Sequence, residues 1–426
     1  HRFLGTVICA LVLGVAGPGA AAVAAPFPAD AHIDRVVVNP GGDASTTAAV
    51  SFRGMGRDGA VEIDPPYGNA RTEPATAVLR HGQLPAELDP FSGTGEHFSA
   101  VLGGLRPGVT YRYRPVVDGR PGAWAEFSTA TESAEPFSFL YFGDAQNSLT
   151  DVWPKVTRHA FAHAPEAALI VQPGDQVDLP NIDHEWADFF TGLHGQTATR
   201  PYLSAPGNHE LMLDPMLREH RAHFEYPYNG HAAFPETTYF VDYQGVRFVT
   251  LHANYMGLEQ QNAWLDSVLT ENPHQWAVVV FHQPVWSVAQ RRADPVHNHA
   301  FRATLEHHDV DLVLTGHDHG YGRGHSAERE AGSGFHDGPV YVSAVSGGKY
   351  YSVDTAGDPW RKFGGVRVRT AGGLSTFHHV AVDGCRLTFE AIVGHSSSEA
   401  TLPLVEGDVL DEFEIDKCGQ GKRVTG

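Results

Sequence analysis

The sequence predicts an all-β amino-terminal domain followed by a layered α/β domain. In residues 32–131, short runs of alternating polarity are separated by turn residues, which is typical of strands exposed on one face. After residue 136, continuous apolar runs alternate with helical stretches, which favours strands buried on both faces and covered by helices. The polar segment 131–136 separates the two patterns, so we take it as the linker.

The first domain is predicted to be a β-sandwich. About 100 residues with turn signals at regular intervals are typical of that architecture. No cluster of metal-type residues is visible in its sequence, so we expect a structural or partner-facing module. The expected strands are 35–38, 47–52, 77–79, 97–102 and 110–117.

The second domain is expected to hold its ligands at one edge of a sheet. Its helical stretches are 262–269 and 298–308. In α/β sheets, ligands gather at the carboxyl ends of the strands. The buried strands are predicted at 137–142, 168–171, 246–251, 277–281, 310–314 and 340–345, and further β structure is predicted at 377–382, 386–393 and 409–415.

The amino-terminus and the cysteines both indicate export. Residues 3–15 are apolar, and Ala22-Val23-Ala24 fits a signal-peptidase site, so we predict a signal peptide over 1–24; a retained membrane span is the alternative. Outside that segment the cysteines are Cys385 and Cys418, which we expect to form a disulfide, with two buried thiols as the alternative. The formal charge of −20 disfavours nucleic acid and anionic membranes as partners.

Five short motifs, each at the end of an apolar run, carry the chemistry. They are FGDAQ, GDQVD, GNHE, FH and GHDH, and their oxygen and nitrogen donors are Asp144, Asp175, Asn208, His282, His317 and His319. Such a set can hold two hard or borderline cations side by side. Two divalent cations about 4 Å apart repel by roughly 17 kcal/mol at an effective dielectric near 20, so a bridging anion is needed.

Asp175 is the expected bridging carboxylate, because Gly174 before it allows a tight turn. Asp144 is then expected on one metal and Asn208 on the other. In an extended chain His317 and His319 would point to one side, so that each could serve one metal while Asp318 faces away. His282 would complete the set of ligands around the second metal.

This motif pattern resembles the calcineurin-like metallophosphoesterases, and the preceding sandwich resembles the fibronectin type III-like domain of their purple acid phosphatase branch. The resemblance implies a four-layer α/β/β/α catalytic domain over 137–418, with 419–426 as a tail, and two metal ions (Fe, Zn or Mn). It implies that Asp144, Asp175 and His319 bind the first metal. It implies that the second is bound by Asp175, Asn208, His282 and His317.

Two positions depart from the family pattern. Asp178 stands where purple acid phosphatases have the tyrosine that gives their colour, and Gln146 stands where other members have a histidine. The first metal therefore lacks its usual fourth ligand. Asp178 could bind this metal directly or through water, or it could only accept a hydrogen bond from one of the metal's ligands. Gln146 could offer its amide oxygen to the metal. We expect a colourless protein.

The resemblance implies a secreted, acid phosphatase-like phosphomonoesterase that uses a metal-bridging hydroxide. His209 is the expected proton donor to the leaving group, or else a phosphate contact. Further substrate contacts are expected from His297, His299, Tyr321 and Arg323. The alternatives are a phosphodiesterase on the same site and a degenerate metal-binding module. Oligomeric state and natural substrate are not predicted.

Overall fold

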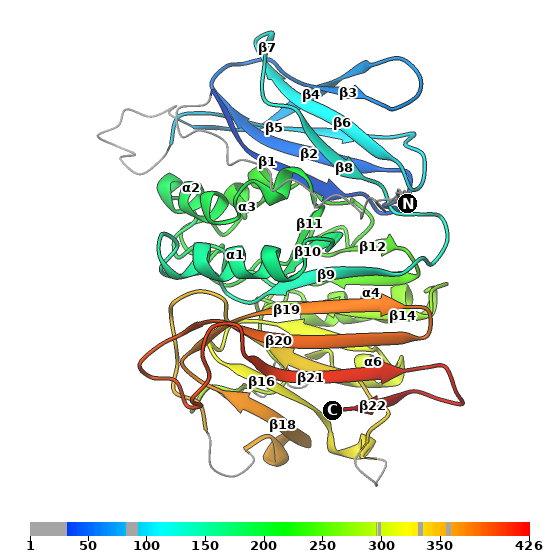
Figure 1. Ribbon diagram of the computed structural model, residues 1–426, viewed down its shortest axis with the longest axis vertical. Coiled ribbons are helices and arrows are strands. Elements are labelled where there is room, and N and C mark those ends of the chain that lie inside the picture. The colour runs from blue at the N-terminus through cyan, green and yellow to red at the C-terminus, as the bar shows by residue number, and fades with distance from the viewer. Residues whose placement is uncertain (1–31, 82–92, 295, 297–299, 331–334, 355–358) are drawn as a thin grey trace, which may run out of the picture.

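The computed structural model describes residues 32–81, 93–294, 296, 300–330, 335–354 and 359–426 (Figure 1). The expected signal peptide, 1–24, and the candidate contacts His297 and His299 lie outside the described residues. Among the described residues, none of the helices combines the length and hydropathy needed to cross a bilayer.

The amino-terminal domain is the predicted β-sandwich. Its strands follow the order β1-β2-β5-β4-β3-β6-β7, and β8 also pairs with β6. The start of β4 pairs with β3 and its end pairs with β5, so β4 joins the two sheets. The strands are β1 (Ile33–Pro40), β2 (Ala48–Gly54), β3 (Gly59–Asp64), β4 (Arg71–His81), β5 (Gly95–Leu102), β6 (Thr110–Val117), β7 (Arg120–Pro121) and β8 (Ala125–Ser128).

The second domain contains two packed sheets. The first has the order β11-β10-β9-β19-β20-β21-β22, and the second has β12-β13-β14-β15-β17-β16-β18. The strands are β9 (Phe137–Phe142), β10 (Leu169–Gln172), β11 (Tyr202–Ser204), β12 (Tyr239–Tyr243), β13 (Val246–Thr250), β14 (Trp276–Val280), β15 (Leu312–Thr315), β16 (Tyr321–Ser326), β17 (Val340–Ser343), β18 (Gly365–Ala371), β19 (Leu374–Asp383), β20 (Arg386–Ser396), β21 (Val409–Asp416) and β22 (Arg423–Thr425).

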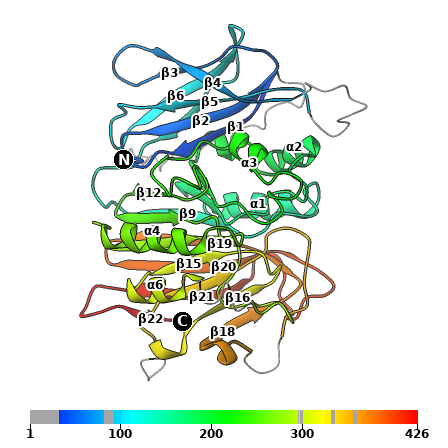
Figure 2. The ribbon, with the colours of Figure 1, turned by 180° about the vertical axis from the view of Figure 1, so that it is seen from behind.

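Helices cover the outer faces of both sheets, which confirms the predicted α/β/β/α layering. Figure 1 shows α1 and α2 in front of the first sheet, and Figure 2, which views the molecule from behind, shows α4 and α6 in front of the second. Trp153 of α1 packs edge-on against Phe142 of β9, with ring centroids 5.3 Å apart. The helices are α1 (Val152–His163), α2 (Asp183–Gly192), α3 (Arg218–His223), α4 (Leu258–Thr270) and α6 (Arg302–His307), with 3-10 turns η1 (Gln196–Ala198), η2 (Ala327–Arg329) and η3 (Pro359–Phe363).

The strand directions bring the motif residues to one edge. Strands β9, β10 and β11 are mutually parallel, as are β13, β14, β15 and β17. Asp144, just after β9, forms a backbone bridge with Val345, just after β17, so the carboxyl edges of the two sheets meet there. The continuous apolar runs were therefore sound guides to these strands.

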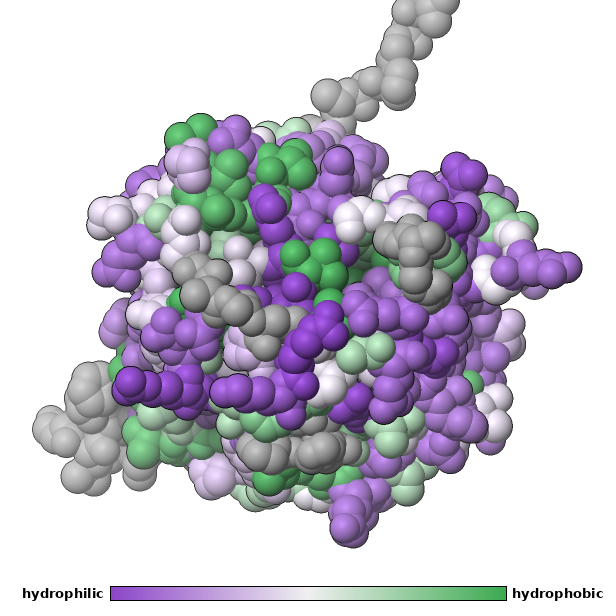
Figure 3. Space-filling model, turned by 90° about the horizontal axis from the view of Figure 1, so that it is seen from below, coloured by the Kyte–Doolittle hydropathy of each residue, from purple (hydrophilic) through white to green (hydrophobic). Residues whose placement is uncertain are grey.

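The sandwich packs directly on the second domain. Asn39 Nδ2 in β1 donates a hydrogen bond to the carbonyl of Tyr202 in β11, at 3.2 Å, and Thr197 Oγ1 donates to the carbonyl of Val36, at 2.9 Å. The predicted Cys385–Cys418 disulfide is confirmed. Figure 3 views the molecule from the end opposite the sandwich, where most residues are hydrophilic and hydrophobic ones occur in small groups.

Candidate metal centre

The carboxyl ends of five strands position the predicted ligands. Asp144 follows β9, Asp175 follows β10, Asn208 follows β11, His282 follows β14, and His317 and His319 follow β15. Two groups of three donors arise, with the ligand atoms of each group within 4.8 Å of one another. They are Asp144, Asp175 and His319, and Asp175, His282 and His317. Asp175 belongs to both groups, which is the position required of a bridging carboxylate.

The second group has a compact arrangement of donors. His282 Nε2 lies 3.0 Å from Asp175 Oδ2 and 3.1 Å from Asn208 Oδ1. His317 Nδ1 lies 2.8 Å from Asn208 Oδ1 and 3.2 Å from His282 Nε2. His282 Nδ1 donates to the carbonyl of Pro173 at 3.0 Å, so in the neutral ring Nε2 is the unprotonated nitrogen that faces the site.

The first group contains Asp144 Oδ2 at 3.3 Å from His319 Nε2. His319 Nδ1 donates to the carbonyl of Lys349 at 3.0 Å, so this ring too directs its unprotonated Nε2 inward. The backbone N–H of His317 donates to both oxygens of Asp144, at 2.8 and 3.0 Å. That contact fixes the carboxylate between the two sheets.

The backbone at the ligands is unusual. Asp175, His317 and His319 adopt left-handed φ values of 52°, 72° and 47°. The segment 317–319 is therefore not extended, so the prediction of an extended chain was wrong here. The expected outcome nevertheless holds, because Asp318 faces away and accepts hydrogen bonds from the Ser287 hydroxyl and the Val288 backbone. Left-handed non-glycine residues cost about 1–3 kcal/mol each and concentrate at functional sites.

The two positions that depart from the family pattern have different surroundings. Gln146 is fully buried, its Nε2 lies 3.0 Å from Asp175 Oδ2 and 3.5 Å from His319 Nε2, and its Oε1 has no hydrogen-bond partner in the described structure. The carboxylate of Asp178 is 39% exposed and lies 3.3 Å from His209 Nδ1. Gln146 thus lies at the first metal group, whereas Asp178 faces the proposed proton donor.

Glu210, the last residue of the GNHE motif, has a role that the sequence did not reveal. Its buried carboxylate accepts the backbone N–H groups of Asp175, Gln176 and Gly207 at 2.7–2.8 Å. It therefore ties the loop after β10 to the loop after β11. Burial and the nearby Asp175 raise the pKa of Glu210 to about 7.

The electrostatics of the site favour added positive charge. Burial raises the pKa of Asp144, and Asp175 raises it further. The ion-pair partners of Asp144 and Asp175 in the described structure are histidines rather than lysine or arginine. Burial opposes charge on His282, but Asp175 and Asp144 outweigh it and raise its pKa to about 9. Closely spaced buried carboxylates need a compensating cation, and the donor set suits two divalent ions.

A polar cavity adjoins the metal centre, and two of the predicted substrate contacts lie elsewhere. A cavity of about 190 Å³ adjoins His317 and is lined by Tyr255, Gln283, Pro284, Ser287, Arg292, Asp294, His317 and Asp318. Tyr321 and Arg323, expected to be substrate contacts, are buried instead and bind the Asp411 carboxylate in β21. The expectation was wrong because β16 turns both side chains into the interior.

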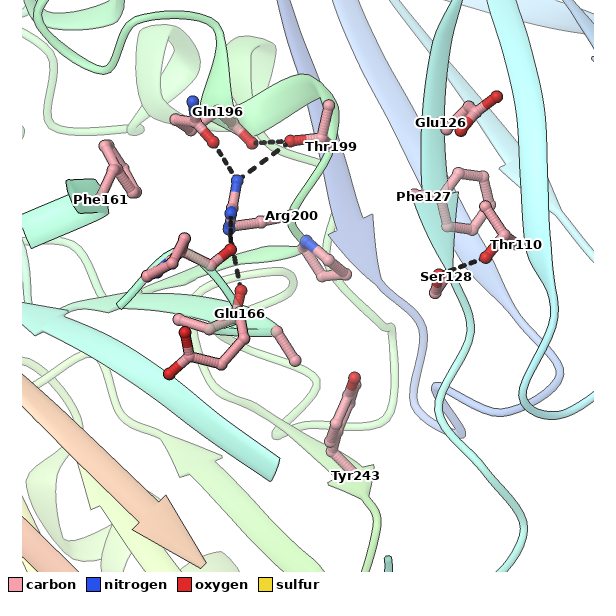
Figure 4. Close-up of a pocket in the computed structure, with 14 residues that line it drawn as sticks. Thr110, Glu126, Phe127, Ser128, Phe161, Glu166, Gln196, Thr199, Arg200 and Tyr243 are labelled. Carbon is pink, nitrogen blue, oxygen red and sulfur yellow. Dashed lines mark hydrogen bonds between the residues drawn. The ribbon is translucent and has the colours of Figure 1, made fainter. Parts of the chain in front are cut away.

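A larger cavity of about 550 Å³ lies between the sandwich and the second domain, and no metal-ligand candidate lines it. Figure 4 shows Arg200 at its wall. The guanidinium donates to the carbonyls of Ala167 and Pro165 and to Gln196 Oε1, so its donors are engaged within the chain. This cavity therefore offers no free arginine donor for a phosphate.

Residues 137–321 match the calcineurin-like phosphoesterase family, so the chain contains a calcineurin-like metallophosphoesterase domain. Its purple acid phosphatase homologues include purple acid phosphatase 18 of Arabidopsis thaliana, 25% identical over 274 residues that cover 60% of this chain and 59% of that protein. Probable purple acid phosphatase 20 of the same plant is 25% identical over 62% of this chain and 63% of its own length. The chain thus spans about three fifths of the length of these relatives.

Solved structures support the same fold. The purple acid phosphatase PPD1 from yellow lupin (Lupinus luteus) seeds superposes with a TM-score of 0.73 at 16% identity, over 90% of this chain and 74% of that one. The structure of PhoD superposes with a TM-score of 0.65 at 12% identity, over 92% and 91%. The lupin match extends over the β-rich region as well as the metallophosphoesterase domain.

Proposed function

We propose that the chain is a secreted, metal-dependent phosphoric ester hydrolase of the acid phosphatase-like, phosphomonoesterase type. The observation that carries the proposal is the pair of donor groups that share Asp175. The purple acid phosphatase homologues support the reaction class. The disulfide supports export, because such bonds persist in oxidising compartments.

The donor chemistry identifies which residues would hold the ions. Asp144, Asp175 and His319 would bind the first, with Gln146 as the additional ligand if its amide turns Oε1 inward. Asp175, Asn208, His282 and His317 would bind the second. When bound, the two cations would activate a water molecule as the nucleophile and offset negative charge on the phosphoryl group. Zinc, iron and manganese all accept such nitrogen and oxygen ligands.

His209 is the proposed proton donor to the leaving oxygen. Its backbone N–H donates to Asp175 Oδ1 at 2.9 Å, and its Nδ1 donates to the carbonyl of Asp178 at 2.8 Å. These two bonds hold the ring beside the bridging carboxylate and leave Nε2 available to a substrate. General acids of this kind typically contribute about 10²–10⁴-fold.

Arg292 is a substrate-binding candidate that the sequence did not reveal. Its Nη2 contacts His317 Nε2, on the opposite side of the ring from the metal-facing Nδ1. If Nδ1 binds a metal, a neutral ring carries its proton on Nε2, which then cannot accept from arginine. The guanidinium would turn into the adjoining cavity. There it could bind the additional charged oxygen that distinguishes a monoester from a diester.

The proposal is tested with Asp175→Ala and His317→Ala, which should abolish hydrolysis of nitrophenyl phosphate and remove bound metal while the fold survives. His163→Ala, at an exposed histidine of α1, is the matched control and should retain both. Full activity in either site variant would refute the hydrolase assignment. If wild-type protein binds fewer than two metal ions and hydrolyses no ester under any metal, it is a degenerate binding module.

Monoester preference has its own test. Arg292→Met should raise the KM for nitrophenyl phosphate about 10–100-fold, because a hydrogen bond to a charged group contributes about 1.5–3 kcal/mol. Hydrolysis of bis-nitrophenyl phosphate should change less. The exposed neighbour Arg291 provides the control variant Arg291→Met. A wild-type preference for the diester would favour the phosphodiesterase alternative.

A further inference from the structure

A second group of metal-type side chains lies where the sandwich meets α3. His81 ends β4, His97 lies in β5, and Glu219 lies in the first turn of α3. One ligand atom from each residue lies within 4.8 Å of the other two. The group shares no residue with the candidate metal centre described above. The sandwich sequence alone showed no such cluster, because the carboxylate comes from the other domain.

Several polar atoms of this group are buried without a hydrogen-bond partner among the described residues. His97 is 1% exposed and its Nε2 has no hydrogen-bond partner among the described residues. The same holds for both ring nitrogens of His81 and for Glu219 Oε2. His81 Nε2 and Glu219 Oε2 lie 3.2 Å apart, which is an ion pair when His81 is protonated, but the contact is not a hydrogen bond. Buried polar atoms are normally paired, so unpaired donors that meet at one place indicate a missing ligand.

The surroundings of His97 leave one nitrogen of its ring available to bind a cation. The backbone of Ala222 interacts with the His97 ring, and Nε2 is the ring nitrogen without a hydrogen-bond partner among the described residues. A backbone bond of this kind fixes the tautomer of metal-ligating histidines and leaves Nε2 unprotonated. The nearby His223 is not a further ligand. Its Nδ1 donates to the carbonyl of Glu219 at 2.8 Å, and its Nε2 accepts from Arg35 at 3.2 Å.

The charges around the group also favour a cation. Arg35 pairs with Asp183 at 2.7 Å. Arg53 pairs with Asp34 and with the same Asp183. These arginines and aspartates balance one another, whereas Glu219 has no lysine or arginine partner in the described structure. Its ion-pair contact in that part of the chain is with His81, so a neutral His81 ring would leave one carboxylate to be neutralised by a cation.

We propose that His81, His97 and Glu219 bind one zinc-type divalent cation that joins the β-sandwich to the phosphoesterase domain. Two imidazoles and a carboxylate are an established zinc ligand set, and water would occupy the fourth position. Ligands at about 2.1 Å from a tetrahedral ion stand about 3.4 Å apart. The observed separations of up to 4.8 Å thus require only small side-chain rotations. The ion would link β4 and β5 to α3.

The test is the zinc content of the full-length protein after saturation with zinc and dialysis. Wild type should hold one equivalent more than Glu219→Gln and one more than His81→Gln. The matched control is Glu390→Gln, because His163, His379 and Glu390 form another His-His-Glu group. Those side chains are more exposed, and Glu390 already contacts both histidines, at 3.4 and 3.5 Å. The control should retain the wild-type zinc content.

Equal zinc content in wild type, Glu219→Gln and His81→Gln would overturn the proposal. If His81→Gln fails to fold, the isosteric Glu219→Gln decides the outcome. Crystals of wild type should give an anomalous zinc peak beside His97 Nε2, and a zinc-soaked crystal without that peak would also refute the site. The variants should keep wild-type hydrolysis of nitrophenyl phosphate. A protein with this zinc but no esterase activity would refute the proposed function and leave this inference standing.

Discussion

Replacement of Gly316 by alanine should disable the first metal group without disturbing the fold. An added Cβ at Gly316 would lie 2.0 Å from Asp144 Oδ1. Because Cβ contacts below 3.0 Å are essentially never seen, the carboxylate must shift by about 1 Å or more. That shift would break the two hydrogen bonds from the His317 backbone, at 2.8 and 3.0 Å. Gly316 has no left-handed φ, so the effect is steric.

A misplacement of about 1 Å typically costs about 100-fold in rate, so kcat/KM for nitrophenyl phosphate should fall by about that factor. Bound metal should fall by one equivalent from the dinuclear centre. The control is Gly103→Ala, where an added Cβ meets nothing within 4 Å. Thermal melts of both variants would establish that each is folded. Wild-type activity and metal content in Gly316→Ala would refute the proposed position of Asp144 at the metal.

Three further outcomes are expected. His209→Ala should lower kcat by about 10²–10⁴-fold for an alkyl phosphate and by less for nitrophenyl phosphate, whose leaving group needs no proton; equal losses would argue against a proton donor. The purified protein should show no strong visible charge-transfer band, since Asp178 replaces the colour-giving tyrosine; a coloured protein would contradict this. Burial lowers the pKa of His378 to about 3, so the unfolded chain binds the extra proton between about pH 6.5 and 3, and stability falls as the pH drops through that window. The free energy of unfolding, measured with urea, should fall by about 1.4 kcal/mol less per pH unit in His378→Gln than in wild type across this pH range. If the free energy of unfolding falls equally steeply with pH in both proteins, this reasoning is refuted.

The strands and the ligand list could be predicted because their causes are local. Continuous apolar runs fold as strands buried on both faces, and 137–142 and 310–314 did so as β9 and β15. Polar residues at the ends of such runs then gather at one edge, since the parallel strands present their carboxyl ends together. Asp144 and His319 meet there, although they are far apart in the chain.

Side-chain environment was not predictable in the same way. Tyr321 and Arg323 follow the HxH motif closely, yet both face Asp411, which comes from a strand much later in the chain. The direction of a side chain after a turn depends on φ. The left-handed φ values at 317 and 319 could not be predicted from the sequence, because both residues are histidines rather than glycines. Arg292 has no motif either, and its relevance comes from its contact with His317.

The sequence by itself determined the two-domain order, the α/β architecture and the identity of the six metal-ligand candidates, because hydrophobic periodicity and donor chemistry are properties of short segments. Only the tertiary structure decided that Gln146 rather than Asp178 faces the first metal group, and that Glu210 ties the loops together. It also brought His81 and His97 to Glu219 across the domain boundary. Those outcomes depend on which distant segments pack together, and long-range packing leaves no mark on any one stretch of sequence.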